Sequence, residues 1–440
     1  MLRRQSLHRR FGRISRSAVF CAALLFSLLH WATVHAQTTP QAKLFAVAQN
    51  GSRNFSSAEV AEVGGLQKGA LVDQPAIQAA ANRLAGSGLF SSVRYQYSTD
   101  VNGLSVTFQL QDALLFPVSL DNIPWVTLAD LTTALNQAGI PFHGTAPAAG
   151  TINGQIAQQL QKMLEAKGVH ATVAYTVSAK PGTDDEIIQF KAAGAEVKLA
   201  SLQFTDPLAS RDPAVQNGVA SLKNQPYSVA AIERFDFQTV QPVYLAHSYL
   251  QVTFAAPVVQ LAGQDAVQVT VPITPGPAYL WGGVAWNGNH AYTTADLNSL
   301  VTAAGLSAGQ PADGNKIVAI WKSVREAYGH RGYIDATVEP KENFDAATHS
   351  AAYIVNISEG DQYHMGKLVL SGLSIDAERR LRASWKIPQG QVFDQTYCDF
   401  FISKGATDAL KGLPAAQDKI GHYLQKNPQQ HTVDVMIDFE

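Results

Sequence analysis

The chain repeats itself at an offset of 84 residues, and this self-similarity constrains its fold more than any other feature. The segments TPGPAYLWGGVAWNG (274–288) and SEGDQYHMGKLVLSG (358–372) align without a gap. Identical residues meet at four positions: Gly276 and Gly360, Tyr279 and Tyr363, Gly282 and Gly366, Gly288 and Gly372. Fainter versions of this pattern precede it at 195–206, 114–123 and 45–51. A regular period is typical of tandem structural units, so the five segments predict five units of about 70 to 85 residues.

The first unit shows its expected elements most clearly. PAIQAAANRLAGSG (75–88) starts with proline, carries apolar residues such as Leu84 at helical spacing and ends in glycine, which predicts a helix with Leu84 buried. VRYQY (93–97) and LSVTFQLQ (104–111) flank an Asn102-Gly103 turn and predict two antiparallel strands. Apolar residues alternate with Ser, Thr and Gln in the second strand, so one face of the sheet is buried and the other is solvated.

The other units follow the same plan with decreasing clarity. In the fourth unit, apolar residues at helical spacing run from Ile317 to Tyr328, and an alternating strand runs from Tyr353 to Ile357. We therefore predict an α+β fold, a tandem array of five β-α-α-β-β units, each a three-stranded mixed sheet covered on one face by two helices. The predicted units are 37–112, 113–194, 195–276, 277–360 and 361–440. Because each unit has a small core, contacts with its neighbours are expected to stabilise it.

Residues 1–36 have the three regions of a secretory signal peptide. Six arginines without an acidic residue come first, then the apolar run SAVFCAALLFSLLHWA, then small residues before Gln37. We expect cleavage before Gln37, with an uncleaved N-terminal anchor as the alternative. The formal net charge then changes from −2 to about −2 − 6 = −8, and Cys398 remains as the single cysteine, so no internal disulfide is expected. No later apolar run reaches the ~20 residues of a membrane-spanning helix.

The sequence resembles the POTRA domain, the periplasmic repeat of outer-membrane barrel-assembly and surface-antigen proteins. The resemblance rests on GSGLFSSVRYQYSTDVNGLSVTFQLQD in the first unit and on YGHRGYIDATVEP with AAYIVNISEGDQYHMGKLVLSG across the fourth and fifth. Gly88-Leu89-Phe90, Gly332-Tyr333 and Glu359-Gly360 match the helix break and the strand end of the family pattern. Most chains with several POTRA domains continue into a transmembrane β-barrel. The fifth unit extends to Glu440, so we expect a POTRA array without the barrel, which is either a free-standing array or the periplasmic arm of a longer protein.

The resemblance implies a binding mode in which an edge strand of a unit accepts a strand of another polypeptide, known as β-augmentation. The strand after the second helix is the implied edge. Its residues are Arg94, Tyr95, Gln96 and Tyr97 in the first unit, Val173, Ala174, Tyr175, Thr176 and Val177 in the second, Val252 to Phe254 in the third, and Ile334, Asp335, Ala336, Thr337 and Val338 in the fourth. The alternative for each unit is an edge strand that water alone covers.

The sequence carries no motif of a known catalytic centre. It lacks G-x-S-x-G, a Walker loop and H-E-x-x-H, and no two histidines of the mature chain have metal-ligand spacing on one helix. We predict no enzymatic activity, no catalytic residue, no metal and no cofactor. Asp184-Asp185-Glu186 is expected to be a solvated turn, with a weak cation site as the alternative. Cys398 is expected to be buried and unreactive, whereas Trp281 and Trp286 fit a core and an interface equally well.

Two functional hypotheses follow from the repeat and its resemblance. The first is a scaffold of the periplasm or outer membrane that binds polypeptides by β-augmentation during outer-membrane protein assembly or translocation. Its partners would be unfolded outer-membrane barrel polypeptides or a barrel-assembly partner protein through which it associates with the membrane. The alternative is a structural spacer with one fixed envelope partner and no clients. The mildly acidic mature chain gives no reason to expect nucleic acid as a partner.

Overall fold

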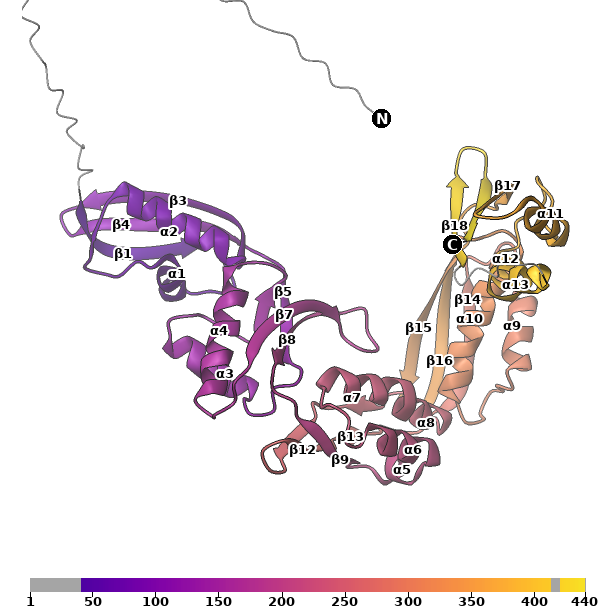
Figure 1. Cartoon of the computed structure of the whole chain (residues 1–440), viewed down its shortest axis with the longest axis horizontal. Helices are drawn as coiled ribbons and strands as arrows, with labels where there is room; N and C mark the ends of the chain where they lie inside the picture. The colour runs from indigo at the N-terminus through magenta and orange to yellow at the C-terminus, as the bar shows by residue number, and fades with distance from the viewer. Residues whose placement is uncertain (1–40, 413–419, 440) are drawn as a thin grey trace, which may run out of the picture.

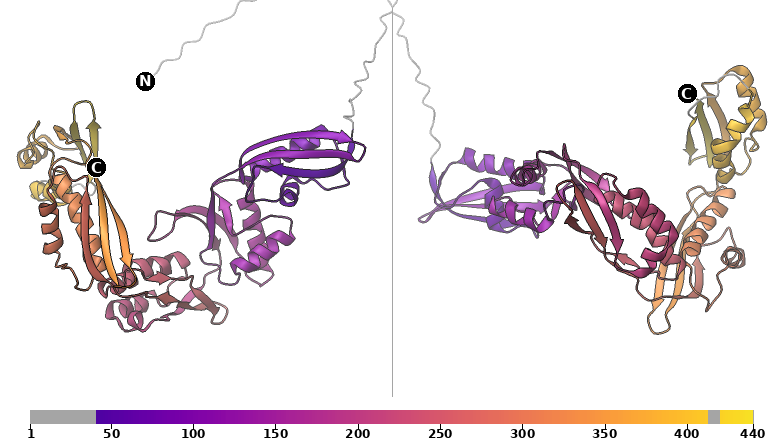
Figure 2. Two further views of the ribbon diagram at one scale, coloured as in Figure 1. Left: turned by 180° about the vertical axis from the view of Figure 1, so that it is seen from behind. Right: turned by 60° about the horizontal axis from the view of Figure 1, so that its bottom comes forward.

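The computed structural model describes residues 41–412 and 420–439, so the predicted signal peptide lies outside the described residues. The fold is mixed α+β, with helix-covered sheets following one another along the chain. These sheets form a curved row that begins at β1 and ends at β18 and β19 (Figure 1). The curvature is also visible from behind and from below (Figure 2). We name each sheet by its first strand.

The β1 sheet has the strand order β2-β1-β4-β3, with β1 parallel and β3 antiparallel to β4. Its elements are β1 (Ala42–Asn50), α1 (Ser57–Gly64), β2 (Leu71–Val72), α2 (Gln74–Ser87), β3 (Phe90–Asp100) and β4 (Gly103–Asp112). Helix α1 begins at a capping box formed by Ser56 and Glu59, and α2 begins after the N-cap Asp73. Leu84 of α2 is completely buried, as its spacing predicts.

The β5 sheet repeats this topology with the order β6-β5-β8-β7. Its elements are β5 (Leu115–Leu120), α3 (Leu128–Gln137), β6 (Thr145–Pro147), α4 (Thr151–Glu165), β7 (Thr172–Ala179) and β8 (Glu186–Ala193). The prediction of three strands per sheet is wrong for both the β1 and the β5 sheet. In each, the loop between the two helices contributes a short extra strand that pairs with the outer edge of the first strand.

The β9 sheet is the most irregular one. Its elements are β9 (Lys198–Phe204), α5 (Pro207–Arg211), α6 (Pro213–Leu222), α7 (Val229–Phe235), the π-helix η1 (Asp236–Val240), α8 (Gln241–Ala246), β10 (Thr253–Phe254), β11 (Val258–Leu261), β12 (Ala266–Val271) and β13 (Ile273–Thr274). The sequence predicts a long helix near 229–247, and α7, η1 and α8 form a continuous helical segment over 229–246. The wider η1 turn precedes Pro242, which lacks an N–H group. Pro257 and Pro272 divide the following hairpin into the pairs β11-β12 and β10-β13.

The β14 and β17 sheets have the orders β14-β16-β15 and β17-β19-β18. Their elements are β14 (Leu280–Asn287), α9 (Thr294–Ala303), α10 (Gly314–His330), β15 (Thr337–Asp345), β16 (Ser350–Ser358), β17 (His364–Ser371), α11 (Ile375–Ser384), α12 (Gln395–Phe400), η2 (Phe401–Gly405), α13 (Ala406–Leu410), β18 (Ile420–Asn427) and β19 (Thr432–Phe439). Trp281 and Trp286 lie in the core of the β14 sheet, so of the two expectations, core and interface, the structure shows the core. Cys398 is buried in the core of the β17 sheet, as predicted.

The repeated glycines have a common steric role at the end of the first strand. Gly288 and Gly372 have φ values of 79° and 78°, in the left-handed region. A Cβ atom at Gly288 would lie 2.2 Å from the Ile357 carbonyl oxygen, and one at Gly372 would lie 1.9 Å from the Phe439 carbonyl oxygen. The chain therefore turns away from the first strand in contact with the backbone of the last strand, where no side chain fits.

Three junctions between successive sheets join the end of one helix to the beginning of another. The end of α2 contacts the start of α4, where a Cβ atom on Gly88 would lie 2.0 Å from the Ala149 carbonyl oxygen. Helix α8 meets α10, and the Asn315 side chain donates a hydrogen bond of 2.8 Å to the Pro242 carbonyl. Helix α10 meets α12, and His330 Nδ1 lies 2.9 Å from Asp394 Oδ1. These contacts bring a helix of one sheet against a helix of the next sheet along the row (Figure 1).

The hydrophobic cores divide the row differently from its sheets. The buried apolar residues of the β1 and β5 sheets form one continuous cluster from Leu44 to Ala192. The β9, β14 and β17 sheets each have a cluster of their own.

Candidate functional site

The predicted residues of the first unit lie in β3, at one edge of the β1 sheet. Tyr95 and Tyr97 stand opposite the buried residues Phe108 and Val106, on the face that the helices cover. The two tyrosine rings stack with centroids 6.5 Å apart, and Tyr95 Oη donates a hydrogen bond of 3.0 Å to Gln78 of α2. Tyr97 remains 46% exposed. This edge therefore combines strand backbone with an accessible aromatic surface beside α2.

The predicted residues of the second unit lie in β7, at an edge of the β5 sheet. Along its length β7 pairs with β8, and Tyr175 lies against the buried ring of Phe190 at 5.8 Å. The eight residues TVAYTVSA contain neither proline nor a charged side chain. Natural edge strands are usually protected by such residues or by a covering segment, because their unpaired backbone groups attract other strands. The edge at β7 has no such protection in its own sequence.

The prediction for the fourth unit is wrong at three of its five residues. Ile334, Asp335 and Ala336 lie in a turn before β15, which begins only at Thr337. Ile334 packs against the core of the β17 sheet, and Lys426 Nζ of β18 lies 2.6 Å from Asp335 Oδ1. These residues therefore form the contact between two sheets, and the adjoining repeat holds them out of the strand.

Strand β15 itself carries the protection that β7 lacks. It begins with the predicted residues Thr337 and Val338 and continues with Glu339, Pro340 and Lys341. Proline is tolerated in an edge strand only where its missing N–H would face away from the neighbouring strand. Pro340 therefore removes a donor from the open edge, and the charged residues beside it oppose pairing with a further strand.

In the third unit, the predicted residues 252–254 overlap the two-residue strand β10, which pairs with β13. The open edge next to it is β11, whose Val258 is 51% exposed. Pro257 separates the two short strands, so the β9 sheet offers an interrupted edge. Of the predicted edges, β7 and β15 pair with their neighbours without a register shift, and β3 has one shift near its start.

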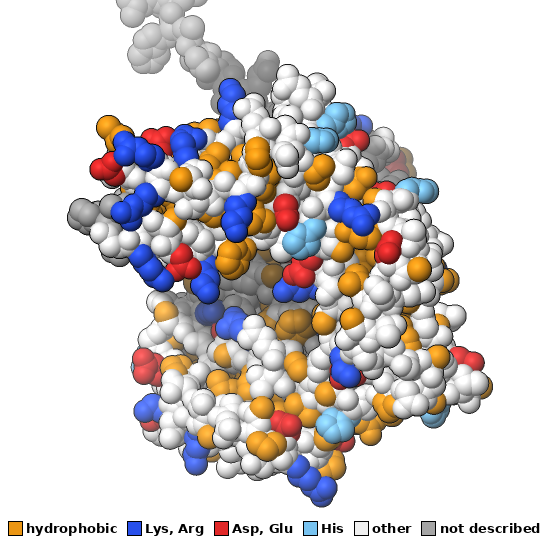
Figure 3. Space-filling view, turned by 90° about the vertical axis from the view of Figure 1, so that its right-hand side faces the viewer, with side chains coloured by type: hydrophobic (Ala, Val, Ile, Leu, Met, Phe, Trp, Pro, Cys, Tyr) orange, Lys and Arg blue, Asp and Glu red, His pale blue; other side chains and the backbone are white. Residues whose placement is uncertain are grey.

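The ionisable groups of the described residues do not form a cluster suited to a metal ion. No group of three or more His, Cys, Asp or Glu residues able to hold a metal occurs within 41–412 and 420–439. Burial raises the pKa of the Cys398 thiol to about 12, so this thiol stays protonated. On the face shown in Figure 3, basic and acidic side chains are interspersed and do not form a field of one sign. In the same described ranges, no helix is long and apolar enough to cross a membrane.

Sequence reasoning considered only the edge after the second helix and overlooked an irregular inner strand, β5, which lies between β6 and β8. The first strand of the β5 sheet diverges from its neighbour and lines a cleft beside the β9 sheet. Pro117 inside β5 was the available signal, since proline in a strand indicates an edge or an irregularity.

The strand-helix-helix-strand-strand order of β14 to β16 defines the class of this fold, a small repeat with one helix-covered sheet. Residues 279–360, which hold these elements, match the family model POTRA, described as a surface antigen variable number repeat. This stretch of the chain therefore has the sequence pattern and the element order of a POTRA domain.

Similarity to individual proteins extends over other parts of the chain. A Treponema pallidum (strain Nichols) protein named "Putative outer membrane protein assembly factor" is 24% identical over 223 residues, which are 47% of this chain and 25% of the relative. The chain thus spans about a quarter of that relative's length. Among solved structures, POTRA domains 3–5 of Haemophilus influenzae BamA are 19% identical with a TM-score of 0.42, covering 56% of this chain and 96% of that chain. POTRA domains 1–3 of Omp85 from Anabaena are 14% identical with a TM-score of 0.19, covering 73% and 96%.

Proposed function

We propose that this chain is a scaffold of the periplasm and outer membrane that binds extended polypeptide segments during outer-membrane protein assembly or translocation. The POTRA match at 279–360 and the similarity to an assembly factor support this setting. We also propose five POTRA-like units, 37–112, 113–194, 195–276, 277–360 and 361–440. The recurrence of a first strand parallel to a last strand in each of the sheets supports this division. The proposed partners are unfolded outer-membrane polypeptides or an assembly partner protein at the membrane.

The observation that carries the proposal is the unprotected edge of β7. An eight-residue edge strand without proline or charge attracts other strands, which a protein avoids unless the edge is used. Backbone hydrogen bonds to an added strand would supply affinity, and pockets for alternate side chains would supply preference. Strand β3, with its tyrosine pair, is the second proposed edge.

Two proline variants of β7, Thr176→Pro and Val177→Pro, test the proposal in the full-length chain. Adjacent residues of a strand direct their N–H groups to opposite sides, so one variant breaks the pairing with β8 and the other removes an outward donor. We expect the outward variant to keep its melting profile and its protected β8 amides, yet to lose binding of fluorescent peptides with alternating apolar residues. Glu342→Pro is the matched control, because it faces outward on β15 like Pro340 two residues earlier. Wild-type peptide affinity in the folded outward variant would contradict capture at β7.

A structural spacer is the second candidate function, and the helix contacts between neighbouring sheets favour it. Junctions such as α8 with α10 and α10 with α12 hold neighbouring sheets in defined orientations. A spacer should recover one constant partner from envelope extract, whereas a client-binding scaffold should recover many unfolded outer-membrane polypeptides. The two functions are therefore separable by the diversity of the recovered proteins.

A further inference from the structure

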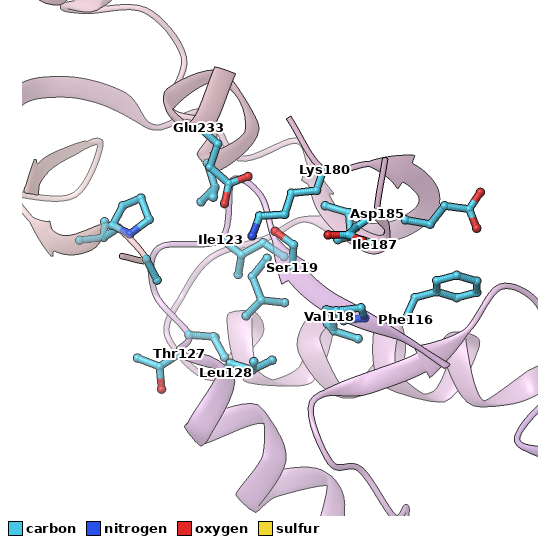
Figure 4. A pocket seen from close by; sticks show the side chains of 18 of the residues that line it. Phe116, Val118, Ser119, Ile123, Thr127, Leu128, Lys180, Asp185, Ile187 and Glu233 are labelled. Carbon is cyan, nitrogen blue, oxygen red and sulfur yellow. The ribbon is translucent and has the colours of Figure 1, made fainter. Parts of the chain in front are cut away.

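A cleft of about 1020 Å³ lies where the β5 sheet meets the β9 sheet (Figure 4). One wall comes from β5 and the loop after it, the second from the β7-β8 turn and the start of β8, and the third from α7 and the residues around the start of β11. Many of the lining side chains are apolar, among them Phe116, Val118, Ile123, Ile187 and Val259. Its volume is sufficient for a ligand of several residues.

The cleft exists because the β5 sheet is split along half of its first strand. β5 pairs with β8 only through Val118–Leu120, which are three residue pairs. The corresponding first and last strands share six pairs in the β1, β9 and β17 sheets and seven in the β14 sheet. The preceding residues of β5, Leu115–Pro117, pair instead with β6 on the other side, and Pro117 has no N–H for a ladder. The first half of β5 therefore has no pairing with the first two residues of β8, Glu186 and Ile187, and both segments line the cleft.

Contacts at both ends of the cleft hold its walls in place. Asp121, which is 2% exposed, accepts hydrogen bonds from the Ser228 hydroxyl at 2.8 Å and from the Ala230 N–H at 2.9 Å, at the start of α7. At the other end, the ring of Phe237 lies so close to Gly182 in the β7-β8 turn that a Cβ atom there would be 2.5 Å from it. The two sheets therefore meet at two anchored points with the cleft between them, and the site is preformed.

The charges around the cleft are mostly negative. Asp184, Asp185 and Glu186 are exposed on the β7-β8 turn, and Glu233 extends from α7. Lys180 is the cation among the lining residues, and Figure 4 shows its side chain extended toward Glu233. Burial raises the pKa of Glu233, and the Lys180 ammonium partly counteracts that effect. Four carboxyl groups against one ammonium favour a ligand that brings positive charge to an apolar interior.

We propose that this cleft binds an extended polypeptide segment that combines apolar side chains with Lys or Arg, lying beside the first half of β5 and the start of β8. The apolar walls accept its side chains, and the exposed carboxylates at the rim attract its basic residues. The inference rests on the proposed function in that the ligand is a polypeptide. It adds a second site to the β5 sheet, at β5 and the start of β8, apart from the edge strand β7. It also assigns that site a preference for basic clients.

The test uses the full-length chain and two fluorescent decapeptides with alternating valine, one with lysine and one with glutamate at the polar positions. The rim variant carries Asp184→Lys, Asp185→Lys and Glu186→Lys. Its matched control carries the same charge change at exposed acids outside the cleft, Glu165→Lys, Glu196→Lys and Asp265→Lys. We expect the rim variant to bind the lysine peptide about tenfold more weakly and the glutamate peptide more tightly. The control variant should change the affinity for either peptide by less than about twofold.

A wall variant and a competitor complete the experiment. Phe116→Ala should weaken both peptides, and bound peptide should protect the amides of Leu115 and Ile187 from hydrogen exchange. Equal effects of the rim and control variants on peptide affinity would overturn the proposal. The proposal would also be overturned if dodecyl maltoside displaced the peptide and the bound peptide did not protect the amides of Leu115 and Ile187. The folded β7 proline variant separates the two sites. If it loses peptides without basic residues and retains the lysine peptide, the cleft acts independently of the edge.

Discussion

Replacing Gly288 by alanine should destabilise the β14 sheet, because the added methyl group meets two separate obstacles. With φ at 79°, the residue lies in the left-handed region, which costs an L-residue about 1–2 kcal/mol. The new Cβ would also lie 2.2 Å from the Ile357 carbonyl oxygen, so the backbone of β16 must shift. Overpacking of this kind costs about 1–3 kcal/mol. The sum predicts a loss of about 2–5 kcal/mol in the local stability of this sheet.

Gly309→Ala, in the loop between α9 and α10 beside the same sheet, is the matched control. Gly309 has φ at 75°, and no atom lies within 4 Å of the position that its new Cβ would take, so it meets only the first obstacle. Hydrogen exchange of the β16 amides in the full-length chain measures the local free energy of opening for both variants, with the β1 sheet as an internal reference. Equal losses in the two variants, or a loss below about 0.5 kcal/mol for Gly288→Ala, would refute the steric explanation of the repeated glycine.

Three further predictions follow from burial and charge. Leu84→Ala should reduce the stability of the β1 sheet by about 2–4 kcal/mol, measured as lost amide protection in α2, because the completely buried side chain leaves a cavity. Burial, reinforced by Glu233, raises the pKa of Asp236 from 3.8 to about 7. The folded state therefore binds the proton more tightly, and the stability of the β9 sheet should fall as pH rises from about 4 to 7. Asp236→Asn should reduce this pH dependence in denaturation followed at several pH values, and Glu233, whose pKa burial also raises, should account for the remainder. A double-mutant cycle on His330 and Asp394 should give a coupling below about 1 kcal/mol at pH 6, because the pair is partly exposed.

Much of the fold follows from local sequence patterns. The alternation of Leu104, Val106 and Phe108 with polar residues places these side chains in the core, and the structure buries all three. The proline near the start of α2 and the glycine after it mark the ends of that helix correctly. These features depend on residues close together in the chain, where propensity and periodicity act directly.

The candidate site was harder to predict because its geometry depends on distant residues. Ile334, Asp335 and Ala336 have the apolar and polar pattern of a strand start, yet Lys426 and the core of the next sheet hold them in a turn. The cleft depends on β6, whose pairing with Leu115–Pro117 draws β5 away from β8. Pro117 marks an irregular strand, but no local pattern names the partners in either contact, so both became visible only when distant segments were placed together.

The single core that joins the β1 and β5 sheets also determines where such an array can be cut and recombined. Phe55 of the β1 sheet packs on Phe90 of β3 and on the ring of His143 beside β6. A crossover between residues 112 and 113 would therefore expose a packed interior on both fragments. A crossover between 194 and 195 would fall between two separate core clusters, which both contact the partly buried Trp125. The smallest module that can be inherited, deleted or transplanted at this end of the chain is therefore a pair of repeats.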